Sequence, residues 1–155
     1  MRSVARLLIV HHTPSPATHT LLEAVHEGAT NPDITGVEVE LRPALGATAS
    51  DVLEADGYLL GTPANLGYMS GALKHFFDTV YYPCLDATVA RPYGLWIHGN
   101  NDTDGAAASV ERVVTGLRWK LAQPVLAVVG EPTASDREAA WELGAVLAAR
   151  VAEGL

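Results

Sequence analysis

Short apolar runs recur along this chain at residues 7–10, 58–60, 93–97 and 125–129. Continuous hydrophobicity, as opposed to alternation, is typical of strands buried on both faces of a sheet. Over residues 37–41 apolar side chains alternate with glutamates, a pattern that favours a half-exposed edge strand. The sequence therefore predicts four buried strands and one edge strand.

Helical spacing occupies the segments between these runs. Apolar residues recur at intervals of three and four, most clearly over 73–81 and 110–121, which predicts amphipathic helices. Leu21, Leu22 and Val25 mark a shorter helix, and a weak helical turn is predicted near residues 50–54. Ser135 with Glu138 forms a capping-box pattern that opens a last helix ending near Val151.

Strands and helices thus alternate along the whole chain. This order favours a three-layer α/β/α sandwich with a parallel sheet and helices on both faces. Five strands suit the doubly wound order 2-1-3-4-5. With 155 residues, no internal repeat and no linker, we expect a single domain over 1–155, with residues 83–92 as a surface loop.

Composition narrows the classes of partner. The formal net charge of −8 makes nucleic acid and anionic membranes poor partners. The first apolar run is too short for a signal peptide or a membrane span, so we expect a soluble, unexported protein. Cys84 is the only cysteine, which excludes an intramolecular disulfide, fits the cytoplasm and leaves an inert thiol. The spacing of the six histidines predicts no metal site.

In open α/β sheets, ligands bind beyond the carboxyl ends of the strands, so the loops after the first, third and fourth strands matter most. The first loop carries Thr13, Ser15 and Thr18 and leads into a helix, whose N-terminus attracts anions. It contains no Lys or Arg and no Gly-Lys-Ser/Thr motif. The pattern predicts a site for a phosphate monoester held by neutral donors. An ordinary Ser/Thr helix cap is the alternative.

The second loop runs from Gly61-Thr62-Pro63 through Gly67 to Met69-Ser70-Gly71, and a helix carrying Lys74-His75-Phe76-Phe77-Asp78 follows. This segment resembles the flavin-binding loop of the flavodoxin-like NAD(P)H:quinone oxidoreductases and NADPH-dependent FMN reductases. A Gly/Pro turn before an amphipathic helix is the alternative. Glycine at 67 suits close backbone approach and a positive φ.

The resemblance implies a flavodoxin-like fold that binds FMN. Flavodoxins carry Ser/Thr-x-Thr-Gly-x-Thr in the first loop, which the hydroxyls of Thr13-x-Ser15-Pro16-x-Thr18 match. The chain departs from this pattern at Pro16, which lacks an N–H donor, and at His11, where an aromatic residue is usual. The implied flavin contacts in the first two loops are Thr13, Ser15, Ala17, Thr18, Pro63, Ala64, Asn65, Leu66, Gly67 and Tyr68.

The third loop follows the fourth strand, and in the resembling proteins it contacts the pyrimidine side of the flavin. The implied contacts are His98, Gly99, Asn100, Asn101, Asp102 and Thr103. Asp102 has two interpretations: repulsion of the anionic reduced flavin, or capping of the next helix. His98 either contacts a substrate oxygen or packs beside a loop. Tyr68 is a stacking candidate, whereas Trp96, Trp119 and Trp141 are expected to pack in the core or between helices.

In this interpretation FMN carries the chemistry and the protein supplies no nucleophile or acid–base pair. The predicted reaction passes electrons from NAD(P)H through FMN to a quinone or a similar small acceptor. One alternative is a flavodoxin-type electron carrier whose partner is a redox protein. Another is a flavin-free binding protein on the same fold. The resemblance also implies a homo-oligomer.

Overall fold

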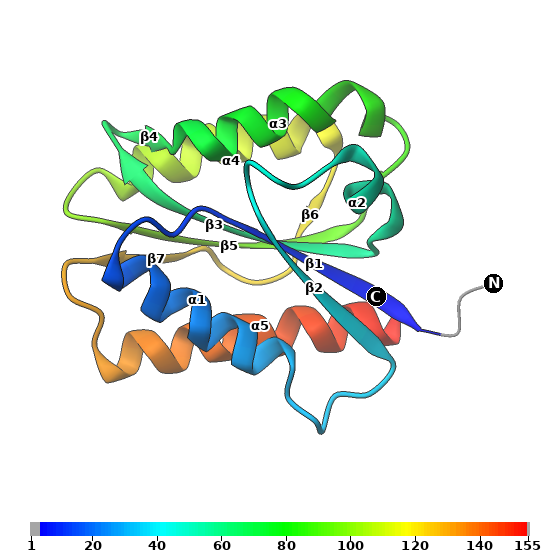
Figure 1. The fold of residues 1–155 in the computed structure, drawn as a ribbon, viewed down its shortest axis with the longest axis horizontal. Coiled ribbons are helices and arrows are strands. Elements are labelled where there is room, and N and C mark those ends of the chain that lie inside the picture. The colour runs from blue at the N-terminus through cyan, green and yellow to red at the C-terminus, as the bar shows by residue number, and fades with distance from the viewer. Residues whose placement is uncertain (1–3, 155) are drawn as a thin grey trace.

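The computed structural model describes residues 4–154, which fold into a sheet between two layers of helices (Figure 1). The strands are β1 (Ala5–His11), β2 (Val37–Pro43), β3 (Gly57–Asn65), β4 (Tyr68–Met69), β5 (Pro92–Gly99), β6 (Lys120–Leu121) and β7 (Leu126–Val129). The helices are α1 (Pro16–Ala29), α2 (Ala49–Glu54), α3 (Gly71–Cys84), α4 (Thr103–Leu117) and α5 (Ala134–Glu153).

The sheet is parallel in order β2-β1-β3-β5, with β6 and β7 both pairing to the outer edge of β5. The predicted order 2-1-3-4-5 is therefore confirmed, although the sheet has seven strands where five were expected. The predicted strand over 125–129 is present as β7, whereas β6 is an added two-residue strand at residues that were expected to end a helix. The remaining addition, β4, is antiparallel to the end of β3.

Helices cover both faces of the sheet, as the alternating pattern predicted. In Figure 1, α1 and α5 lie together on one side, and α2, α3 and α4 lie on the other. Each side encloses its own apolar cluster, one containing Leu7, Leu59 and Trp96 and the other Phe76, Phe77 and Trp119. Two of the three tryptophans are thus core residues, and Trp141 on α5 is 37% exposed.

The hydrophobic pattern identified the central strands correctly. In β1, β3 and β5 the predicted apolar runs are buried, and β2 is a partly exposed edge strand. The prediction was wrong for residues 125–129, which were expected to be buried on both faces. Val128 is buried but Val129 is 60% exposed, because β7 is the other edge of the sheet.

Three helix boundaries differ from the sequence prediction. The helix expected over 110–121 ends at Leu117, because Arg118 adopts a left-handed conformation with φ of 60°. The last helix is capped by Thr133 with Asp136, and Ser135 lies inside it. The loop expected over 83–92 begins later, because α3 includes Pro83 in its last turn. The short helix near 50–54 is present as α2.

Candidate functional site

The loops after β1, β3 and β5 meet at the carboxyl edge of the sheet. Strand register sets this arrangement: His11 pairs with Gly61, and Pro63 pairs with His98. The His12 N–H also donates to the Gly61 carbonyl at 3.0 Å, which extends the contact between the first two loops. A glycine is required at 61, because a Cβ there would overlap the ring of Trp96.

The first loop is short and ends in a well-made helix cap. Ser15 caps α1: its Oγ accepts the Thr18 N–H at 3.2 Å, and the Thr18 hydroxyl oxygen accepts the Ser15 N–H at 3.0 Å. The Thr18 hydroxyl donates in turn to the Ser15 carbonyl at 2.9 Å. Both sequence interpretations of this loop thus concern the same atoms, since Ser15 and Thr18 form a capping box at the mouth of a helix.

This cap determines which donors remain for an anion. Thr18 is 3% exposed and its hydroxyl proton is engaged, so it shapes the loop from within. Pro16 occupies the first helical position, where a missing N–H costs nothing because that group has no intrahelical acceptor. The first-turn N–H of Ala17 lacks an intrahelical acceptor, and Thr13 and Ser15 are half-buried with their hydroxyls in the same loop.

The second loop is a tight hairpin between β3 and β4. Leu66 and Gly67 form its tip with φ values of 52° and 71°, and Asn65 pairs with Tyr68 across it. The Thr62 hydroxyl accepts the Ser70 N–H at 2.9 Å and donates to the Pro63 carbonyl at 2.8 Å. The buried base of the hairpin is therefore rigid, while its tip projects from the sheet.

The hairpin tip packs directly against the start of α4. A Cβ added at Gly67 would overlap the carboxylate of Asp102, and one at Gly105 would overlap the Gly67 carbonyl oxygen. Sequence reasoning selected Gly67 and Asp102 but missed Gly105, whose only local signal is its position three residues after the capping Asp102. It also missed Ser109, whose hydroxyl accepts the Met69 N–H at 3.0 Å from 40 residues away.

Asp102 is the N-cap of α4, so its capping interpretation is confirmed. Its backbone is left-handed with φ of 47°, and its Oδ1 accepts the Gly105 N–H at 3.1 Å. Its other oxygen faces Gly67. Repulsion of a reduced flavin by this carboxylate stays a prediction.

The remaining residues of the third loop differ in their accessibility. Asn100 and Asn101 are exposed and Thr103 is buried. Gly99 lies close to the second loop, where an added Cβ would be 2.9 Å from the Ala64 Cβ. His98 is half-buried, and its Nε2 is 2.8 Å from the Gly130 carbonyl oxygen. That contact requires a protonated Nε2, so His98 ties β5 to the loop after β7.

The carboxyl edge has the donors and the exposed apolar side chains that suit an FMN molecule. Loop hydroxyls and a helix N-terminus suit a phosphate monoester. The positive-φ tip at Leu66 and Gly67 exposes backbone beside an open apolar rim, since Leu66 is fully exposed and Tyr68 is 43% exposed. The chain's own residues therefore fit the flavin that the sequence resemblance implied.

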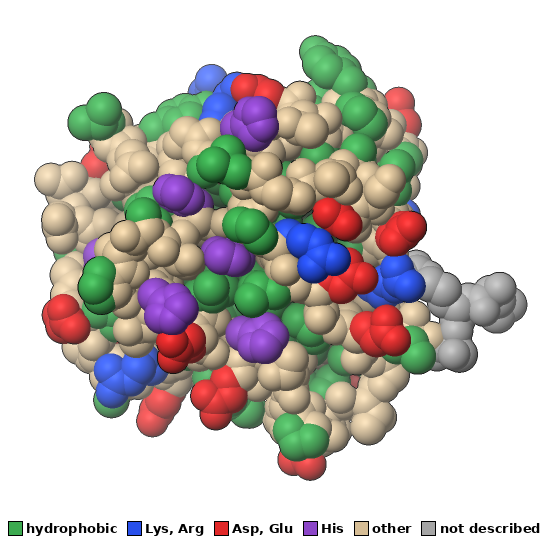
Figure 2. Space-filling model, viewed as in Figure 1, with side chains coloured by type: hydrophobic (Ala, Val, Ile, Leu, Met, Phe, Trp, Pro, Cys, Tyr) green, Lys and Arg blue, Asp and Glu red, His purple; other side chains and the backbone are tan. Residues whose placement is uncertain are grey.

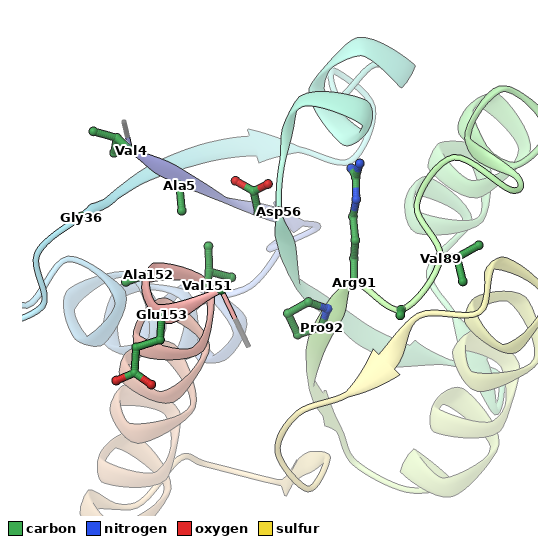
Figure 3. A pocket seen from close by; sticks show the side chains of 12 residues that line it. Val4, Ala5, Gly36, Asp56, Val89, Arg91, Pro92, Val151, Ala152 and Glu153 are labelled. Atoms are coloured by element: carbon green, nitrogen blue, oxygen red, sulfur yellow. The ribbon is translucent and has the colours of Figure 1, made fainter. Parts of the chain in front are cut away.

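A cavity of about 660 Å³ lies at the opposite, amino-terminal edge of the sheet (Figure 3). Its lining is mostly small or apolar and includes Ala5, Pro92 and Val151. Arg91 points away from Glu153, and its guanidinium already donates to the carbonyls of α2 residues. This cavity has no converging set of free polar groups, so it is the weaker candidate for a redox site.

Two further chemistries find no support among the described residues. Within 4–154, no group of three His, Cys, Asp or Glu side chains is placed to hold a metal ion. Cys84 is buried, and burial raises the pKa of its thiol, which disfavours the reactive thiolate. No helix among residues 4–154 is long and apolar enough to cross a membrane.

Comparison with known proteins finds similarity in sequence and in structure. No family model matches the chain. It is 39% identical to a flavodoxin of Aquifex aeolicus strain VF5 over 103 residues, which span 63% of this chain and 55% of that protein. The aligned segment thus covers about half the length of the relative.

The solved structures agree on the fold. A flavodoxin from the domain Archaea superposes with a TM-score of 0.81 at 18% identity, covering 94% of this chain and 98% of that one. A flavodoxin, WrbA-like protein from Agrobacterium tumefaciens gives 0.74 at 22% identity, covering 96% of each chain. The sheet order, the layers and these structural likenesses together show that the chain has a flavodoxin-like fold.

Proposed function

We propose that this chain is a single FMN-binding domain, residues 1–155, that transfers electrons through the flavin. One observation carries the proposal: the backbone of the Leu66–Gly67 tip, with two successive positive φ angles, is held against Asp102 and Gly105 at the carboxyl edge of a flavodoxin-like sheet. Bound FMN supplies hydride and single-electron chemistry, which no protein side chain provides.

The chain's own residues bind and orient the cofactor in this proposal. Thr13, Ser15 and the Ala17 N–H hold the phosphate, with Thr18 shaping the loop behind them. The contacts to the ring system are Pro63, Ala64, Asn65, Leu66, Gly67 and Tyr68 from the second loop and His98, Gly99, Asn100, Asn101, Asp102 and Thr103 from the third. Buried Thr62 keeps the hairpin in place.

We further propose an NAD(P)H-dependent oxidoreductase with a quinone or a similar planar acceptor. The Gly-Thr-Pro to Met-Ser-Gly loop supports this assignment, and the exposed apolar rim of Leu66 and Tyr68 offers a surface on which a planar acceptor could stack. The single free cysteine, Cys84, supports work in the reducing cytoplasm.

A flavodoxin-type electron carrier is the second candidate. The similarity to the Aquifex flavodoxin and the net charge of −8, which suits docking to a basic redox protein, favour it. Electron carriers need no pocket for their own substrate. A homo-oligomer remains part of the oxidoreductase proposal only.

One assay separates these candidates. The purified protein is loaded with FMN, and NADH or NADPH oxidation is followed with and without a benzoquinone. Turnover that depends on both FMN and the quinone supports the oxidoreductase. Bound FMN that is reduced by dithionite but never by NAD(P)H supports the carrier. Folded protein that does not retain or take up FMN overturns both and leaves the flavin-free alternative.

A further inference from the structure

Histidines take the place of lysine and arginine around the first loop. No Lys or Arg occurs between Arg6 and Arg42, whereas His11, His12 and His19 flank the loop on both sides. His11 ends β1, His12 follows it, and His19 lies in the first turns of α1. Figure 2 shows histidine side chains spread over the face of the molecule that carries α1.

His11 is coupled to a hydroxyl that faces the loop. Its Nδ1 is 3.1 Å from the Thr13 Oγ1. A neutral His11 with a bare Nδ1 accepts the Thr13 proton, which leaves only lone pairs on that oxygen. A protonated His11 must donate from Nδ1, so the Thr13 hydroxyl proton is released to donate to an anion. Protonation of His11 therefore adds a charge and a hydroxyl donor together.

The His11 imidazole lies close enough to two other histidines to feel their charge. Burial, followed by the charges of His12 and then His19, lowers the pKa of His11. The His19 Nε2 is 2.6 Å from Glu23 on the same helix, and this carboxylate is the one acidic group in contact with the cluster among the described residues. From β2, the Arg42 guanidinium is engaged by Glu40 and Asp51, and β3 contributes only the backbone of Gly61.

We propose that His11, His12 and His19 supply the positive charge that holds the FMN phosphate, so that FMN binding takes up protons. This inference rests on the proposed function and adds to it the source of the charge. A dianionic phosphate beside the imidazoles favours their cationic forms, and it opposes the burial that disfavours the cationic form of His11. By linkage, FMN affinity rises as the pH falls from 8 toward 6, by about tenfold per pH unit over the range where one full proton is taken up and by less where uptake is partial. Below about pH 6 the phosphate itself protonates, which limits the gain.

The test compares FMN with riboflavin, which has the same ring system without the phosphate. Both ligands are titrated into the apo-protein at pH 8, 7 and 6 by flavin fluorescence. We expect FMN to bind roughly threefold to tenfold more tightly at pH 6 than at pH 8, and riboflavin affinity to stay flat. An FMN affinity that is independent of pH overturns the inference while leaving the proposed function intact. Failure to bind either flavin overturns the proposed function itself.

Matched variants assign the effect to the cluster. His12→Gln and His19→Gln each remove one imidazole, and His26→Gln removes another from the far end of α1 as the control. We expect the first two to flatten the pH dependence of FMN binding and the control to retain it. Riboflavin affinity, measured for every variant, reports whether the ring site is still folded. Equal slopes for all three variants overturn the assignment.

Discussion

The two edges of the sheet differ in how far their polar groups are already hydrogen-bonded within the protein. At the amino-terminal edge, polar side chains form hydrogen bonds with other groups of the protein. At the carboxyl-terminal edge, the loops carry hydroxyl side chains beside the exposed apolar side chains of Leu66 and Tyr68. Both edges belong to the same strands, so the difference comes from the loops that each edge carries.

Arg91 organises the amino-terminal edge. Its guanidinium donates to the carbonyls of Val52, Leu53 and Ala55 at 2.7–3.2 Å, which satisfies the open carbonyl end of α2. It also donates to the Tyr58 hydroxyl at 3.2 Å. Burial raises the pKa of Tyr58 to about 12, so this phenol stays protonated and donates to the Val52 carbonyl at 2.6 Å.

The same edge is completed by stacked aromatic rings. Tyr58 and Trp119 stack with centroids 4.0 Å apart, and the Trp119 indole N–H donates to the buried Thr88 hydroxyl at 2.8 Å. At the carboxyl-terminal edge, Leu66 has a positive φ angle at the hairpin tip and a fully exposed side chain. One edge stabilises the fold and the other is available for a ligand, and substitutions should separate these two roles.

The largest effect is expected from Arg91→Met. Loss of the guanidinium leaves the carbonyls of Leu53 and Ala55 without this donor and should lower the free energy of unfolding by about 3 kcal/mol. Urea denaturation measures this loss. Arg112→Met, an exposed arginine on α4, is the control and should change stability by less than about 0.5 kcal/mol. An equal loss in both variants would mean that the Arg91 network contributes little.

Gly67→Ala should act mainly on the ligand. The substitution places a side chain at φ of 71° and against Asp102, which should cost about 1–2 kcal/mol of stability and weaken FMN binding at least about tenfold. Gly36→Ala has a similar φ of 83° with open space around it, and controls for backbone strain alone. Fluorescence titration of FMN into both variants makes the measurement. Equal affinities in the two variants would remove Gly67 from the site.

Leu66→Ser should leave stability within about 0.5 kcal/mol, because the side chain is fully exposed. We expect FMN affinity to fall by about 1 kcal/mol through the loss of apolar contact with the ring. Val89→Ser, an exposed apolar residue at the amino-terminal edge, should not change FMN affinity. If Val89→Ser weakens FMN binding as much as Leu66→Ser does, the two edges are not functionally distinct.

His11→Gln should have the smallest effect, visible only in the pH dependence of apo-protein stability. Burial holds the folded-state pKa of His11 below the ordinary histidine value of 6.5, so the contribution of His11 to stability is present above pH 6.5 and is lost as the pH falls through its folded pKa. The variant should lose less stability than the parent on acidification. Thermal unfolding from pH 7.5 to 5.5 tests this, with His26→Gln as the control that should follow the parent.

Local patterns predicted the parts of the fold that depend on local chemistry. The apolar runs located β1, β3 and β5, and alternation with glutamates identified β2 as an edge strand. The end of α4 was missed because Leu121 continues the helical spacing by coincidence, whereas Arg118 has already left the helix. The spacing of apolar residues does not show where a residue in the left-handed conformation ends a helix.

In the candidate site, too, the sequence predicted local features but not the contacts between distant segments. The sequence indicated a positive φ at Gly67 and offered a Ser/Thr helix cap in the first loop, because both depend on neighbouring residues. It could not show the packing of Gly67 on Gly105 or the Ser109 contact to Met69, which join distant segments. It also treated the histidines one by one, and only the folded chain couples His11 electrostatically to His19.

The most direct test of the account is equilibrium titration of the folded apo-protein with FMN, followed by quenching of flavin fluorescence, for the parent and for Gly67→Ala. The account predicts saturable binding of one FMN per chain in the parent and markedly weaker binding in the variant. A folded parent protein that leaves FMN fluorescence unchanged, or a Gly67→Ala variant that binds FMN as tightly as the parent does, would contradict a flavin site at the carboxyl edge of the sheet.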